Sequence, residues 1–174
     1  MKNPRSTIRD PQSTTLSPLE YAYRLLAQRD YSEQVLSSKL LVKGFTEEAV
    51  IRTVMRLKEQ KYLNDSRLAA DQSERLNARG FGPAGIKAKL AHKGFSSHTI
   101  DHVLTANDAM EVHASARQLL ASRFSADALQ QPRMYARAFR LLLRRGYSQE
   151  VVESVMGNAP SDECATATEN ENED

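Results

Sequence analysis

The side chains that stand out for chemistry in this sequence are basic, and two stretches of the chain hold bases without any acidic residue. One stretch follows the spacing i, i+4, i+7 and i+11, which lines four guanidinium groups along one helix face: Arg133, Arg137, Arg140 and Arg144. Like charges at this spacing destabilise an isolated helix by about 0.2–0.5 kcal/mol per pair, so the stripe indicates a contact outside the chain. Phosphate groups or an acidic protein groove would provide that contact, whereas the plainer interpretation is a solvated face.

The other stretch runs from residue 75 to residue 93 and supplies five more bases. We predict that its bases and the centre of the arginine stripe form a partner-binding surface. No base-reading motif accompanies them, so a nucleic-acid contact would be independent of sequence. The predicted contact residues are Arg75, Arg79, Lys87, Lys89, Lys93, Arg137, Arg140 and Arg144.

Residues for other chemistry do not assemble into a recognisable site. The sequence has no glycine-rich phosphate loop, no nucleophile elbow and no Cys/His cluster with metal spacing. His98 and His102 lie four residues apart on one expected helix, but a third ligand is not visible. We therefore predict no catalytic residue, no metal and no cofactor, and a protein that is not an enzyme.

Length and composition suit a cytoplasmic monomer. The 174 residues include a single cysteine, and no apolar run approaches the roughly 20 residues of a membrane span. The net charge of +2 hides a basic central part, because residues 17–157 carry 21 basic and 15 acidic groups. Residues 158–174 carry six acids and no base, so we expect an acidic, disordered tail there and a disordered arm over residues 1–16.

The elements that must position the basic residues are helices. Leucine and alanine (19 and 21) far outnumber valine and isoleucine (9 and 4), which favours helix over strand. Pro18, Pro83 and Pro132 each open an apolar-periodic stretch, and five of the seven glycines follow one. Proline at the start and glycine after the end is the arrangement that helices prefer, so we predict an all-α protein.

A short element recurs along the chain. Shifts of 50 and then 52 residues superpose Lys43-Gly44-Phe45, Lys93-Gly94-Phe95 and Arg145-Gly146-Tyr147. Each copy reads as a helix that ends with a base and a left-handed glycine, after which Thr46, Ser96 or Ser148 caps the next helix. We predict nine helices in three tandem three-helix repeats (17–61, 62–106 and 107–157), with a plain connection over 125–131, stacked into an elongated, curved molecule.

Several segments resemble the RecX family of bacterial recombination regulators. The most specific are 62–69 (YLNDSRLA) and 79–83 (RGFGP), followed by Ile86, Leu90 and Lys93-Gly94. Residues 24–32 resemble the first repeat of that family and residues 141–147 the third. The chain departs from the family pattern at Asn64, Leu68 and Lys89, and Lys89 stands where a glutamate is frequent.

The resemblance implies a function as well as a fold. It implies a protein that binds the RecA recombinase filament on single-stranded DNA and inhibits its extension, ATP hydrolysis and strand exchange. Recombination, DNA repair and the SOS response would be regulated in this way, and some family members also bind DNA weakly. The residues leave two alternatives open: a sequence-independent nucleic-acid-binding helical protein, and a helical-repeat scaffold that binds proteins.

Overall fold

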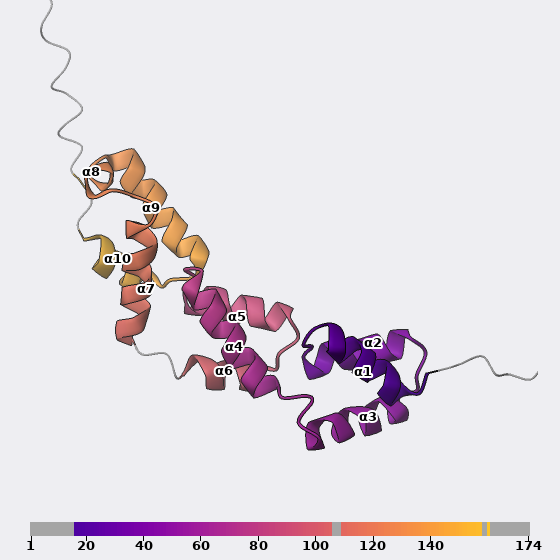
Figure 1. Ribbon diagram of the computed structural model, residues 1–174. Coiled ribbons are helices and arrows are strands. Elements are labelled where there is room, and N and C mark those ends of the chain that lie inside the picture. Colours follow the sequence, from indigo (N-terminus) through magenta and orange to yellow (C-terminus); the bar gives the residue numbers. More distant parts are fainter. Residues whose placement is uncertain (1–15, 106–108, 158–159, 161–174) are drawn as a thin grey trace, which may run out of the picture. The chain divides into compact units, whose positions relative to one another are not determined.

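The structure, a computed structural model, describes residues 16–105, 109–157 and 160. Within these ranges it contains ten helices and no strand, which confirms the all-α prediction (Figure 1). The helices are α1 (Pro18–Gln28), α2 (Glu33–Val42), α3 (Glu47–Glu59), α4 (Asp65–Ala78), α5 (Pro83–His92), α6 (Ser97–Leu104), α7 (Ala109–Ala121), α8 (Ala126–Leu129), α9 (Pro132–Arg145) and α10 (Gln149–Met156).

The first compact unit ends at Leu63 and contains α1, α2 and α3. Its chain begins in a capping box: the Glu20 amide donates to Ser17 Oγ (3.2 Å), and the Ser17 amide donates to Glu20 Oε2 (2.8 Å). The bond from the Ser17 backbone is the main cause that lowers the pKa of the Glu20 carboxyl. The three helices enclose an apolar core of Ala22, Tyr31, Leu36, Leu40, Val50, Val54, Leu57 and Leu63.

The second unit begins at Asn64 and contains α4 to α10 around two apolar clusters. One lies among α4, α5 and α6 and consists of Ala69, Leu76, Ile86, Leu90, Phe95 and Ile100. The other lies among α7, α9 and α10 and consists of Ala116, Leu119, Leu120, Ala138, Leu142, Tyr147 and Val152. We call these helix sets the middle bundle and the last bundle, and α1–α3 the first bundle.

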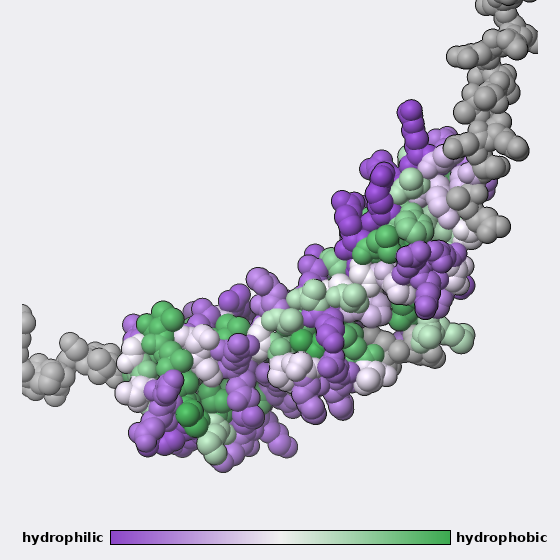
Figure 2. Space-filling view, turned by 180° about the vertical axis from the view of Figure 1, so that it is seen from behind, coloured by the Kyte–Doolittle hydropathy of each residue, from purple (hydrophilic) through white to green (hydrophobic). Residues whose placement is uncertain are grey.

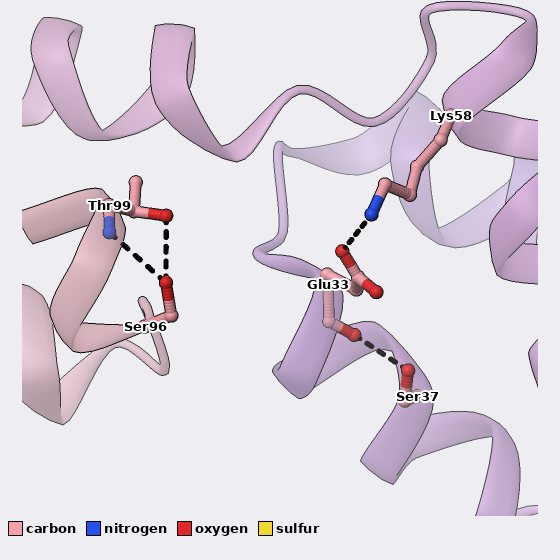
Figure 3. Close-up of polar contacts among 5 residues, drawn as sticks. All are labelled: Glu33, Ser37, Lys58, Ser96 and Thr99. Atoms are coloured by element: carbon pink, nitrogen blue, oxygen red, sulfur yellow. Dashed lines mark hydrogen bonds and ion pairs between the residues drawn. The ribbon is translucent and has the colours of Figure 1, made fainter.

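The recurring turn has the geometry expected from its sequence. Gly44, Gly94 and Gly146 have positive φ angles of 99°, 78° and 89°, which side chains with a Cβ rarely adopt. The next helix starts each time with a side-chain cap, as Ser96 shows by accepting from the Thr99 amide at 3.1 Å (Figure 3). The apolar residue after each glycine packs in the core of its own bundle, and the expected caps at Thr46, Ser96 and Ser148 are all present.

The structure departs from the sequence-based expectation at two places. The connection over 125–131 contains the one-turn helix α8, because Ser125 caps it by accepting from the Ala128 amide at 3.2 Å. The described residues therefore hold ten helices rather than nine. The apolar pattern of residues 18–29 also predicts a buried Ala27, but Ala27 is exposed and Ala22 takes the buried position in α1.

Other expectations stay predictions. The repeat boundaries and the elongated stacking of the repeats are among them. Asn107 and Asp108, residue types that cap helices, are expected to begin the helix after them, but they lie outside the described residues. The arm and the tail, apart from Leu16 and Pro160, lie outside them as well.

Within the second unit, the middle and last bundles meet through their backbones. The Gly82 amide donates to the Arg145 carbonyl (2.9 Å), and the Ala84 amide donates to the Gly146 carbonyl (3.1 Å). A Cβ on Gly82 would lie 2.6 Å from the Gly146 carbonyl oxygen, and one on Gly85 or Gly146 would also collide with the facing backbone. Glycine at these three positions is what allows the start of α5 to reach the end of α9.

Candidate basic surface

The arginine stripe is a real face of α9. Arg133, Arg137, Arg140 and Arg144 are all exposed, and the opposite side of the helix is buried through Ala138 and Leu142. No carboxylate of the described residues forms an ion pair with any of the four guanidinium groups. The stripe therefore presents positive charge to solvent that no ion pair within the described residues compensates.

Four of the five bases from the other stretch come together beside the α4–α5 turn. Lys93, the C-cap residue directly after α5, shows this most directly, because its pKa is lowered first by burial and then by the charges of Arg79, Lys89 and Arg75. Its ammonium group also donates to Gln72 Oε1 on α4. We call Arg75, Arg79, Lys89 and Lys93 the turn cluster.

Lys87 does not belong to the turn cluster. Its Nζ lies 2.8 Å from Asp101 Oδ1 on α6, and both side chains are more than half exposed. Two residues of separation along α5 place Lys87 and Lys89 on different sides of the helix. Asp101 thus partly offsets the charge of Lys87, whereas no ion pair within the described residues offsets the charge of Lys89.

Arg145 was not among the predicted contact residues, yet the structure brings it to the turn cluster. Its Nη1 donates to the Arg79 carbonyl at 2.7 Å, and its Cζ lies 4.7 Å from the centre of the Phe81 ring. Lys89 Nζ lies 4.5 Å from the centre of the same ring. The Phe81 ring thus makes cation–π contacts with two side chains, Lys89 of the middle bundle and Arg145 of the last bundle.

A signal for this arrangement was present in the sequence. The 50-residue shift superposes Tyr31 on Phe81 and Lys39 on Lys89. In the first bundle the Tyr31 ring likewise carries two cations, with Arg29 Cζ at 4.6 Å and Lys39 Nζ at 5.5 Å from its centre. An aromatic residue flanked by bases is therefore a repeated feature of the chain.

Other site types receive no support from the described residues. Over 16–105 and 109–157 no group of three or more His, Cys, Asp or Glu side chains could hold a metal ion, and His98 and His102 are exposed on α6. In the same ranges no helix is long and apolar enough to cross a membrane.

The fold and the surface define a class of protein: an all-helical chain of small bundles with exposed basic clusters. Residues 19–57 match the family model described as RecX, first three-helix domain. The chain is 31% identical over 131 residues to the regulatory protein RecX of Xanthomonas citri. The aligned region covers 75% of this chain and 80% of the relative. It is also 31% identical over 143 residues to the regulatory protein RecX of Chromohalobacter salexigens, over 82% and 93% of the two chains.

These matches show that the chain belongs to the RecX family, whose members here are named as regulatory proteins and not as enzymes. Solved structures agree on the fold. The crystal structure of RecX from Lactobacillus salivarius superposes with a TM-score of 0.68 at 16% identity, over 80% of this chain and 92% of that one. The crystal structure of a second regulatory protein RecX also superposes with a TM-score of 0.68. Its sequence identity is 23%, and the match covers 81% of this chain and 70% of that one.

Proposed function

We propose that this protein binds a RecA-type recombinase filament on single-stranded DNA and inhibits its extension, ATP hydrolysis and strand exchange. Recombination and DNA repair are modulated as a result. The observation that carries the proposal is membership of a family of regulators over at least three quarters of the chain. The fold supports a role in binding, because the described side chains supply basic surfaces and no group of metal ligands.

The proposed contact surface consists of the turn cluster and the arginine stripe. A nucleoprotein filament exposes phosphates and acidic side chains, and exposed bases attract both. Lys87 contributes less, since Asp101 already neutralises it.

Apolar side chains on the first bundle favour a protein partner over nucleic acid alone. Ile51 and Met55 lie one turn apart on α3 and are 58% and 57% exposed, and Val42 at the end of α2 is 89% exposed. Figure 2 shows apolar residues interspersed with hydrophilic ones at the surface. Exposed apolar groups gain free energy by burial against a protein surface.

The deciding experiment measures the ATPase rate of the cognate recombinase on single-stranded DNA, with and without substoichiometric amounts of this protein. We expect a lower rate with the protein present. The variant Arg137→Glu/Arg140→Glu/Arg144→Glu should lose most of the inhibition while its circular dichroism stays unchanged. The matched control, Arg24→Glu/Arg67→Glu/Arg117→Glu, reverses three exposed charges outside the stripe, the turn cluster and α3, and should still inhibit.

Two results would contradict parts of the proposal. Full inhibition by the stripe variant removes the stripe from the contact surface. An unchanged ATPase rate with the unaltered protein rejects recombinase regulation itself.

The exposed basic clusters also favour a second candidate function, sequence-independent binding of single-stranded nucleic acid. In that case the protein alone should bind an oligonucleotide tightly, with a log–log salt slope near −0.7 per phosphate neutralised. Weak binding without recombinase, alongside clear ATPase inhibition, separates the two functions.

A further inference from the structure

A cavity of about 470 Å³ lies between the middle and last bundles of the second unit. The end of α4 and the following turn form one wall, α7 forms another, and Arg145 at the end of α9 closes the site. A volume of this size is in the range of small-molecule sites in proteins. The cavity is thus large enough for a group the size of a nucleotide.

The lining of this cavity is basic and polar. Three of its eleven residues are arginines, Arg79, Arg123 and Arg145, and none is acidic. Among the described residues no carboxylate forms an ion pair with any of the three. Asn77, Ser115 and Gln118 add uncharged hydrogen-bonding groups to the walls.

Arg145 is held in position before any ligand arrives. Its bond to the Arg79 carbonyl uses one guanidinium nitrogen, and its Cζ lies 4.7 Å from the centre of the Phe81 ring. The remaining donors of the fork stay available to a ligand. A side chain fixed in this way loses little conformational entropy when it binds.

The neighbouring bases add to the positive potential of the site. Lys89 shares the Phe81 ring with Arg145, and the lowered pKa of Lys93 reports the charges of Arg79, Lys89 and Arg75 around it. The C-terminal ends of α4 and α9 compensate part of this charge, and a bound anion would compensate more.

We propose that the cavity lined by Arg79, Arg123 and Arg145 is a binding site for a phosphate monoester. Guanidinium groups present parallel N–H donors that match phosphate oxygens, and three of them suit the three terminal oxygens of a monoester dianion. A carboxylate offers only two oxygens in one plane. A phosphodiester has two free oxygens and a single negative charge, so it leaves part of the donor set unused.

Two sources carry this group: a free nucleotide and the 5′-phosphorylated end of a nucleic acid strand. The full-length protein is titrated, without recombinase, with inorganic phosphate, thymidine 5′-monophosphate or thymidine, and chemical shifts of the Gly80 and Arg123 amides are followed. Short oligothymidylates with a 5′-phosphate or a 5′-hydroxyl form the second arm. We expect shifts with inorganic phosphate, thymidine 5′-monophosphate and the 5′-phosphorylated oligomer, and none with thymidine. The tighter ligand of the nucleotide and the phosphorylated oligomer identifies the source.

Variants locate the binding in the cavity. Arg123→Gln and Arg79→Gln should each weaken binding of thymidine 5′-monophosphate by about tenfold or more, since each removes a charge-assisted hydrogen bond. The Arg79 carbonyl that holds Arg145 is kept in the second variant. The matched control is Arg117→Gln, an exposed arginine of α7 that does not line the cavity, and its affinity should stay unchanged.

Three results would overturn the site. If thymidine binds as tightly as thymidine 5′-monophosphate, the phosphate group does not contribute to binding. Equal affinity for the 5′-hydroxyl and 5′-phosphate oligomers assigns the binding to backbone diesters. Equal losses of affinity in Arg117→Gln and Arg123→Gln show that the nucleotide binds through the overall positive charge of the surface and not in the cavity. The recombinase is absent throughout, so none of these results affects the proposed regulation of a filament.

Discussion

The first bundle and the middle bundle contain the same aromatic–cation element, and they complete it differently. In the first bundle the Tyr31 ring contacts two cations, Arg29 and Lys39, and both belong to the same bundle as the ring. In the middle bundle Phe81 takes Lys89 from its own bundle and Arg145 from the last bundle. One repeated local element is therefore used once within a bundle and once to join two bundles.

The glycine of the recurring turn also serves one bundle in one copy and joins two bundles in another. A Cβ on Gly44 would meet no atom within 4 Å, whereas one on Gly146 would collide with the backbone of Gly85. Both glycines have positive φ angles, so both are needed for the local turn. Only Gly146 is needed a second time, for the close approach of α9 to α5.

The largest effect expected from this difference concerns the two glycines. Gly44→Ala should lower the free energy of unfolding by about 1–2 kcal/mol, the cost of a left-handed alanine. Gly146→Ala should cost about 3 kcal/mol or more, because backbone overlap adds to the same strain. Urea unfolding followed by circular dichroism measures both, and equal losses would show that the close approach does not contribute.

A smaller effect is expected at the cations. Arg145→Gln should lower the free energy of unfolding by about 1–3 kcal/mol, through loss of the hydrogen bond to Arg79 and of the contact with Phe81. Arg29→Gln loses only a contact with an aromatic ring and should cost about 0.5–1 kcal/mol. Thermal unfolding of the two variants compares them, and a larger loss for Arg29→Gln contradicts the joining role of Arg145.

The smallest effect sharpens the comparison among the three turns. Tyr147 is buried, and its hydroxyl has no hydrogen-bond partner among the described residues, whereas the matching residues Phe45 and Phe95 have no hydroxyl. Tyr147→Phe removes an unsatisfied polar group and should be neutral or stabilise by up to about 1 kcal/mol. Chemical denaturation at pH 7 measures this change.

The same substitution predicts a dependence on pH. Burial raises the pKa of the Tyr147 hydroxyl above its ordinary value. A group whose pKa is raised by folding stabilises the folded state below the unfolded pKa of about 10, and this contribution is lost as the pH rises through the folded pKa. The unaltered protein should therefore lose stability above pH 10 relative to Tyr147→Phe, and parallel pH curves for the two proteins would contradict the burial of the hydroxyl.

Sequence reasoning succeeded where a structure depends on neighbours along the chain. The left-handed glycines and the Thr46, Ser96 and Ser148 caps depend on local spacing, and all are present. The one-turn helix α8 was missed because four residues are too few to show a helical period.

The site was predictable only in part for the same reason. Exposure of the α9 stripe follows from its period, but the separation of Lys87 from the turn cluster depends on Asp101 in another helix. The part played by Arg145 depends on a contact with Arg79, 66 residues away, which no local pattern contains. Gly82 and Gly85 gave the one available hint, since they are the two glycines that follow no helix.

The backbone bonds from Gly82 and Ala84 to the end of α9 have a further consequence. Amides in the first turn of a helix have no partner within that helix and usually exchange their hydrogens rapidly with water. Here these two amides are closed off by carbonyls from another bundle. Their exchange requires the middle and last bundles to separate, so their protection factors report directly how often that opening occurs in the native protein.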